Sequence, residues 1–161
     1  VESTVGVGSV FTVHLPAYPS TLSSDNSSPE MPLSQNQGRV MLVENHEESA
    51  HIICDILNAA GYQLVWLLEG SMAMTQIEVL KPIAVILSTR LPDIDGYTII
   101  RQLRQNPATK KIKVIALVNP NALNDPERCL EAGANGYLTK PIRPDQVLYQ
   151  LSHLVKSEAQ E

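Results

Sequence analysis

Cysteines, aromatic residues and long apolar runs are all scarce in this sequence. The only two cysteines, Cys54 and Cys129, stand in helix-like apolar surroundings without the spacing of metal ligands. This pattern predicts reduced core thiols rather than a disulfide or a metal site. No apolar run approaches the roughly 20 residues that a membrane span needs, and the first residues lack the pattern of a signal peptide. We therefore expect a cytoplasmic protein that does not cross a membrane.

A basic excess is lacking as well. The formal net charge is −5 and is spread along the chain rather than gathered in blocks. This distribution argues against nucleic acid or an anionic membrane as the partner. Apolar residues nevertheless make up 43 % of the 161 residues, which is enough for one domain with its own core and a tail.

One segment is too polar to fold by itself. Residues 17–37 (AYPSTLSSDNSSPEMPLSQNQ) are rich in Ser, Pro, Asn and Gln, and such a composition predicts a flexible linker. The linker divides the chain into a short head of residues 1–16 and a compact body of residues 38–156, with residues 157–161 as a tail.

The body alternates between apolar strand-like runs and helix-like stripes. We expect strands at residues 39–43, 62–68, 83–88, 113–118 and 135–139, and helices at residues 48–61, 70–80, 96–105, 122–132 and 143–155. Strict alternation with apolar central strands is typical of a parallel sheet covered by helices on both faces. The expected fold is α/β, a flavodoxin-like doubly wound sheet of five strands in the order 2-1-3-4-5.

Function in such a sheet concentrates in the loops at the carboxyl ends of the strands. Glu44 and Asn45 follow the first expected strand, Ser88 ends the third, Val118 ends the fourth and Lys140 follows the fifth. These five residues form the candidate site.

Two runs in these loops, LPDIDGY (91–97) and AGANGYLTKPI (132–142), resemble the response-regulator receiver domain. The resemblance implies a phosphoacceptor Asp at the end of the third strand, a Mg²⁺-binding acidic pair after the first, a hydroxyl after the fourth and a Lys after the fifth. In this sequence the acceptor position is Ser88, the acidic pair is Glu44-Asn45 and the hydroxyl position is Val118. Of the four features, only Lys140 is retained.

These changes remove the chemistry of phosphotransfer. An aspartyl phosphate needs a carboxylate nucleophile beside a divalent cation, and hard cations prefer several oxygen ligands. Ser88 is a weak neutral nucleophile, and Val118 cannot form a hydrogen bond. We expect Lys140 to pair with Glu44, and we interpret Asp93 and Asp95 as turn and cap residues. The sequence thus predicts a pseudo-receiver with no catalytic residue and no metal.

The head adds a second resemblance. VGVGSVFTVHLP (5–16) resembles the end of a histidine-kinase ATP-binding domain, in which a Gly-containing turn leads into a last strand. Sixteen residues cannot form an ATP site, so we expect no enzyme activity from this segment and a histidine kinase as the parent protein.

The run CDILNAAGYQLVWLLEGSMAM (54–74) is similar to the pseudo-receivers of the cyanobacterial circadian input kinases. That resemblance implies binding of the clock protein KaiB in its fold-switched form, a link to quinone sensing, and a parent kinase that acts as a phosphatase toward the clock-output response regulator. No cofactor other than a quinone is implied.

The second expected strand is an edge of the sheet in the order 2-1-3-4-5. Its sequence, YQLVWLL, contains neither Pro nor charge, although natural edges are usually blunted by such residues. A partner could therefore add a strand to it, and the candidate contact residues are Tyr62, Leu64, Val65, Trp66, Leu67 and Leu68. Trp66 is either the anchor of that contact or an ordinary core residue.

Two other functions stay open. The domain could be a phosphorelay receiver that uses Ser88, Asp93 or Asp95 as a non-standard acceptor, or a purely intramolecular regulator of the kinase domain. Tyr137 occupies the position of the switching aromatic of receivers, but Val118 removes its trigger, so we expect Tyr137 to pack against its neighbours.

Overall fold

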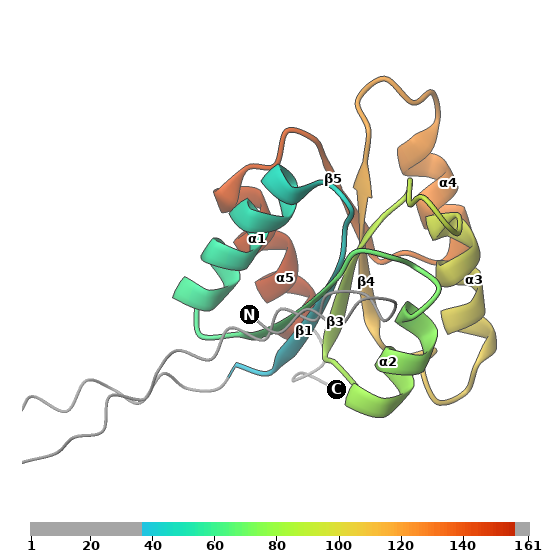
Figure 1. The fold of residues 1–161 in the computed structure, drawn as a ribbon, viewed down its shortest axis with the longest axis horizontal. Helices are drawn as coiled ribbons and strands as arrows, with labels where there is room; N and C mark the ends of the chain where they lie inside the picture. The colour runs from blue at the N-terminus through green and yellow to red at the C-terminus, as the bar shows by residue number, and fades with distance from the viewer. Residues whose placement is uncertain (1–36, 157–161) are drawn as a thin grey trace, which may run out of the picture.

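The computed structural model describes residues 37–156 (Figure 1). The predicted head, all but the last residue of the predicted linker, and the predicted tail lie outside the described residues.

Five parallel strands form one sheet in the order β2-β1-β3-β4-β5, which confirms the predicted fold class and strand order. The strands are β1 (Arg39–Val43), β2 (Gln63–Leu67), β3 (Ala84–Ser88), β4 (Lys113–Val118) and β5 (Gly136–Thr139). The central strand β3 is buried at every residue, which explains why its sequence is apolar throughout rather than alternating.

Five helices connect the strands and cover both faces of the sheet. They are α1 (Glu47–Ala59), α2 (Ala73–Leu80), α3 (Gly96–Gln105), α4 (Asp125–Ala132) and α5 (Pro144–Lys156). Helices α1 and α5 lie together on one face, and α2, α3 and α4 lie on the other (Figure 1). The layers are those of a doubly wound α/β domain.

Two helices begin three residues later than the sequence predicted. Residues 70–72 form a turn closed by the Ala73 amide on the Gly70 carbonyl, and residues 122–124 form another before α4. Asn124 adopts the left-handed conformation with φ 61°, which a helix cannot contain. At both places, the hydrogen bonds of a turn, and not the helical pattern of apolar residues, therefore determine where the helix begins.

The core is divided by the sheet into two clusters. In β1, Met41 and Val43 face the cluster under α2, α3 and α4, whereas Val40 and Leu42 face the cluster under α1 and α5. Successive side chains of a strand point to opposite faces, so each central strand contributes to both clusters. Burial of each such side chain stabilises the fold by about 1.5–3 kcal/mol.

Arg104, in the last turn of α3, ties that helix to the amino ends of two strands. Its guanidinium donates to the carbonyl oxygens of Gly133 (2.7 Å), Lys110 (2.8 Å) and Ile112 (2.8 Å), and to Asn135 Oδ1 (2.7 Å). Planar guanidinium donors suit such a set of fixed acceptors better than an ammonium group does. The side chain thus fixes the end of the sheet opposite the candidate site.

We predict that Arg104→Met lowers the free energy of unfolding by about 2–4 kcal/mol, because several charge-assisted hydrogen bonds are lost from a half-buried position. Arg101→Met on the exposed side of the same helix is the matched control and should change it by less than about 0.5 kcal/mol. Urea unfolding of both variants measures the difference, and equal effects would contradict the assigned role.

Candidate functional site

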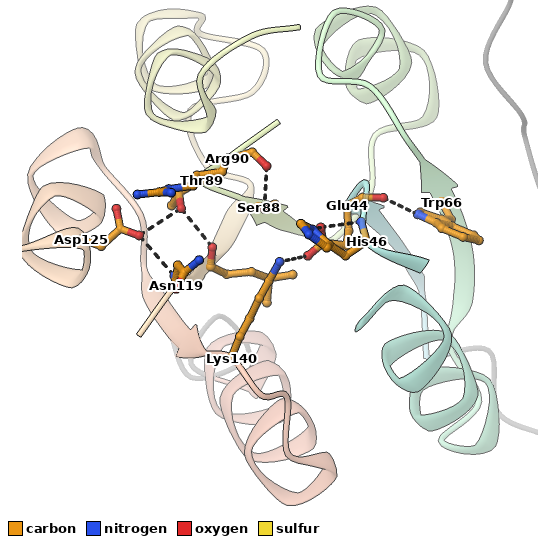
Figure 2. A network of polar contacts seen from close by, with 10 residues as sticks. Glu44, His46, Trp66, Ser88, Thr89, Arg90, Asn119, Asp125 and Lys140 are labelled. Atoms are coloured by element: carbon orange, nitrogen blue, oxygen red, sulfur yellow. Dashed lines mark hydrogen bonds and ion pairs between the residues drawn. The ribbon is translucent and has the colours of Figure 1, made fainter. Parts of the chain in front are cut away.

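The carboxyl ends of the strands bring the predicted site residues to one edge of the sheet. Glu44 directly follows β1, Ser88 and Val118 are the last residues of β3 and β4, and Lys140 directly follows β5. Figure 2 shows Lys140 extending toward Glu44, with Ser88 at the end of the strand between them. The structure therefore brings these predicted residues together, and their role as a functional site stays a prediction.

The centre of this site is an ion pair. Glu44 is fully buried, and the Lys140 ammonium, whose side chain is 19 % exposed, lies 2.7 Å from Glu44 Oε2. The expected pairing of these two residues is present. A carboxylate removed from water needs an opposite charge and hydrogen-bond donors close by. Lys140 provides that charge from the loop after β5, at the same end of the sheet.

The second oxygen of Glu44 is also engaged. Glu44 Oε1 accepts a hydrogen bond from the His46 amide at 3.0 Å. The Asn45 side chain, oriented with its nitrogen toward this oxygen, donates to it at 3.1 Å and to the Arg90 carbonyl at 3.2 Å. Glu44 Oε2, in contrast, has the ion pair with Lys140 but no hydrogen-bond donor of its own. The described part of the chain contains no group of three metal-ligating side chains.

Ser88 is 2 % exposed and is not activated as a nucleophile. Its hydroxyl donates to the Arg90 carbonyl at 3.2 Å, and a carbonyl oxygen cannot remove the proton as a general base does. Val118 is 1 % exposed and packs in the same cluster as Cys129. The two positions therefore offer neither a nucleophile nor a hydrogen-bonding sensor.

Asp93 and Asp95 hold the β3–α3 loop, as their interpretation as turn and cap residues predicts. Asp93 accepts hydrogen bonds from the amides of Gly70 (3.0 Å) and Ser71 (2.7 Å), which joins this loop to the β2–α2 loop. Asp95 caps α3 by accepting from the Tyr97 amide at 3.2 Å. Partial desolvation opposes ionisation of Asp93, but the hydrogen bonds from Gly70 and Ser71 prevail and lower its pKa.

Sequence reasoning missed a buried contact beside the site. Asp125, at the start of α4, is only 3 % exposed. Its Oδ2 accepts from Thr89 Oγ1 at 3.1 Å and from the Asn119 amide at 3.3 Å. An acidic residue in the first turn of a helix is an ordinary surface pattern, so no sequence signal announced its burial. This contact fixes the β4–α4 loop to the end of β3 (Figure 2).

The edge strand β2 presents fewer side chains than its sequence suggested. Trp66 is 5 % exposed, donates from Nε1 to the Glu44 carbonyl at 2.8 Å and meets the His51 ring edge-on at 5.5 Å. Of the two interpretations left open, Trp66 is therefore a core residue. Leu67 is buried as well, whereas the partly exposed members of the predicted edge are Tyr62, Leu64, Val65 and Leu68.

Tyr137 is less well packed than expected, since it is 38 % exposed. Strand β5 alternates, with Gly136 and Leu138 buried and Tyr137 and Thr139 exposed. The alternation places Tyr137 on an open face of the outer strand.

The two cysteines are free thiols, as predicted. Burial raises the pKa of the Cys54 thiol to about 11 and that of the Cys129 thiol to about 12. Both are therefore protonated and poorly nucleophilic near neutral pH.

None of the described helices is long and apolar enough to span a membrane.

The ion pair leads to a prediction for stability. Lys140→Met should lower the free energy of unfolding by about 3–5 kcal/mol, because it leaves the Glu44 carboxylate buried without a cation. The double variant Glu44→Gln/Lys140→Met removes both charges and should recover most of that loss. Urea unfolding of the two variants tests the idea, which fails if the double variant is as unstable as the single one.

Asp93 leads to a prediction for pH dependence. Because its pKa is lower in the folded protein than the ordinary value of 3.8, the ionised carboxylate stabilises the fold above that value, and the contribution is lost as the pH falls further. The stability difference between the native chain and Asp93→Asn should therefore be constant between pH 5 and 7 and shrink below pH 4. A difference that stays constant down to pH 3 would contradict the assigned hydrogen bonds.

Comparison with known proteins agrees with this architecture. The profile of the response regulator receiver domain matches residues 40–152. The circadian input-output histidine kinases CikA of Synechococcus elongatus and Thermosynechococcus vestitus are 31 % and 33 % identical to this chain over 96 % and 94 % of its length. The chain spans only about a fifth of those relatives, 20 % and 21 %.

A solved structure matches the described body. It is the receiver domain of a sensor histidine kinase from Pseudomonas aeruginosa, with a magnesium ion coordinated in its active-site cleft. It superposes with a TM-score of 0.69 at 28 % identity, over 74 % of this chain and 98 % of that one. The sheet order, the helices on both faces and the matched profile agree, and this chain belongs to the response-regulator receiver-domain family.

Proposed function

We propose that this domain is a pseudo-receiver, a protein-interaction module of a sensor histidine kinase that works without phosphotransfer. The observation that carries the proposal is the buried pair of Glu44 and Lys140, 2.7 Å apart, beside a serine at the acceptor position. The lysine supplies the positive charge that a metal ion would otherwise bring to this carboxylate.

The chemistry of the neighbouring groups supports this function. Formation of an aspartyl phosphate requires a carboxylate nucleophile and a cation that stabilises the transferred group. Ser88 supplies no carboxylate, and the Lys140 ammonium is already engaged by Glu44. The Pseudomonas aeruginosa receiver holds magnesium in its cleft, whereas the corresponding strand ends of this chain offer the single carboxylate of Glu44, which is paired with Lys140.

A phosphorelay through another acceptor is supported less well. Both oxygens of Asp93 accept backbone hydrogen bonds, and Asp95 caps α3. Phosphorylation of either residue would disrupt the loop that it holds.

We further propose a cytoplasmic parent kinase in circadian clock signalling. The alignments with the circadian histidine kinases cover 96 % and 94 % of the chain, so they include at least part of the head that resembles the end of a kinase ATP-binding domain. In this proposal the pseudo-receiver regulates or localises the kinase or phosphatase activity of its parent. KaiB is the external partner that the resemblance implies.

The backbone of β2 at Leu64 is the proposed contact surface. The Gln63 amide donates to Gly38 and the Leu67 carbonyl accepts from Glu44, so these alternate residues face β1. In a parallel strand, neighbouring residues direct their amide and carbonyl groups to opposite sides, and Leu64, which follows Gln63, therefore directs its backbone away from β1. A partner strand could bind there through main-chain hydrogen bonds.

The test compares Leu64→Pro with Leu64→Ala. Both shorten the side chain, but only proline removes the outward N–H, and it leaves the hydrogen bonds to β1 in place. Affinity for fold-switched KaiB should fall about ten-fold or more in Leu64→Pro and by less than about three-fold in Leu64→Ala. Titration calorimetry measures both, with circular dichroism to confirm that each variant is folded.

Equal affinities of the two variants would exclude strand addition at β2. Absence of KaiB binding by the native chain would instead favour the purely intramolecular role toward the kinase domain.

A further inference from the structure

A hollow of about 370 Å³ lies between the β3–α3 and β4–α4 loops, and the proposed function does not use it. Its lining includes Arg90, Tyr97, Leu123 and Arg128. We call this hollow the arginine groove. Its size is within the range of small binding sites, about 300–1,000 Å³.

The charges that face solvent in the groove are mainly positive. Asp125 also lines it, but this carboxylate is 3 % exposed and already accepts from Thr89 and Asn119. Of the exposed charged residues, Asp95 is engaged as the cap of α3, whereas Arg90 and Arg128 take part in none of the ion pairs between residues 37 and 156. Asp95 and Asp125 balance the two arginines in number, but both guanidinium groups are left without a carboxylate partner.

One of the two guanidinium groups is held in place. The Arg128 guanidinium carbon lies 4.3 Å from the centre of the Tyr97 ring, a cation–π contact that orients its planar donors. A guanidinium fixed in this way binds a carboxylate with less loss of side-chain entropy than a free one does.

Tyr97 is a second, independent feature of the groove lining. The residue is 4 % exposed, and its hydroxyl has no hydrogen-bond partner within the described body. A buried polar group of this kind is uncommon in native proteins and costs about 1–3 kcal/mol. An acceptor oxygen admitted beside Arg128 would provide the missing partner.

The rim of the groove is apolar on one side, since Leu123 is 90 % exposed. We propose that the arginine groove docks an acidic segment of a protein partner, with a carboxylate bound by Arg90 and Arg128 and an aliphatic neighbour covering Leu123. This surface is distinct from the β2 edge and goes beyond the proposed function. Charge complementarity and the exposed leucine favour a peptide over a free anion.

The test uses the 15N-labelled chain and the peptide Ser-Gly-Leu-Glu-Leu-Glu-Gly-Ser, with the same peptide carrying Gln for Glu as the comparison. The Glu peptide should cause saturable shifts of the Arg90, Tyr97 and Leu123 amides and should bind at least about ten-fold more tightly than the Gln peptide. Arg90→Gln/Arg128→Gln should weaken it about ten-fold or more. Arg101→Gln/Lys111→Gln removes the same charge elsewhere and should leave the affinity unchanged.

Three results would overturn the proposal. The first is the absence of saturable shifts, and the second is an equal loss of affinity in the groove and control variants. The third is that inorganic phosphate at the same concentration reproduces the shifts, because the groove would then be a small-anion site and not a docking surface. Leu123→Asp, which leaves both arginines intact, should also weaken the Glu peptide and guards against an indirect effect of the arginine changes.

Discussion

The buried carboxylate of Glu44 is the constraint on which the rest of the site depends. A charge with no exposed surface must be neutralised inside the fold, and Lys140 does so from the loop after β5. The ion pair therefore joins the loop after β1 to the loop after β5, past the ends of β3 and β4. It also determines what the site can hold, because a lysine ammonium on the carboxylate competes with any metal ion that would bind there.

The surrounding loops are fixed by local contacts in a way that does not depend on a phosphoryl group. Asp93 joins two loops through backbone amides, and the contact between Thr89 and Asp125 holds the β4–α4 loop to β3. A switching receiver needs an element with two arrangements whose balance the signal changes. The side chain of Val118 has no hydrogen-bonding group that could hold a phosphoryl oxygen and move that loop. The architecture is consistent with a rigid scaffold that acts through its surfaces.

Much of this could be predicted from the sequence, and the failures have physical causes. The apolar strands and the amphipathic helices specify the sheet because burial on both faces leaves little choice of residue. The pairing of Lys140 with Glu44 followed from their positions at the carboxyl ends of the strands. The burial of Asp125 and the core position of Trp66 did not follow, since each depends on a tertiary hydrogen bond to a residue distant in sequence. Tyr137 is more exposed than expected because residues of β5 alternate between buried and exposed positions, and Tyr137 occupies an exposed one.

The central claim is that the receiver site of this domain is chemically silent. The most direct measurement is a titration of the 15N-labelled chain with Mg²⁺ and beryllofluoride, a mimic of the phosphoryl group, followed by the amide signals of Glu44, Ser88 and Lys140. The account predicts no saturable change at these positions at millimolar concentrations of both components. Saturable shifts that begin at Glu44 and Lys140 and spread to the β4–α4 loop would contradict it.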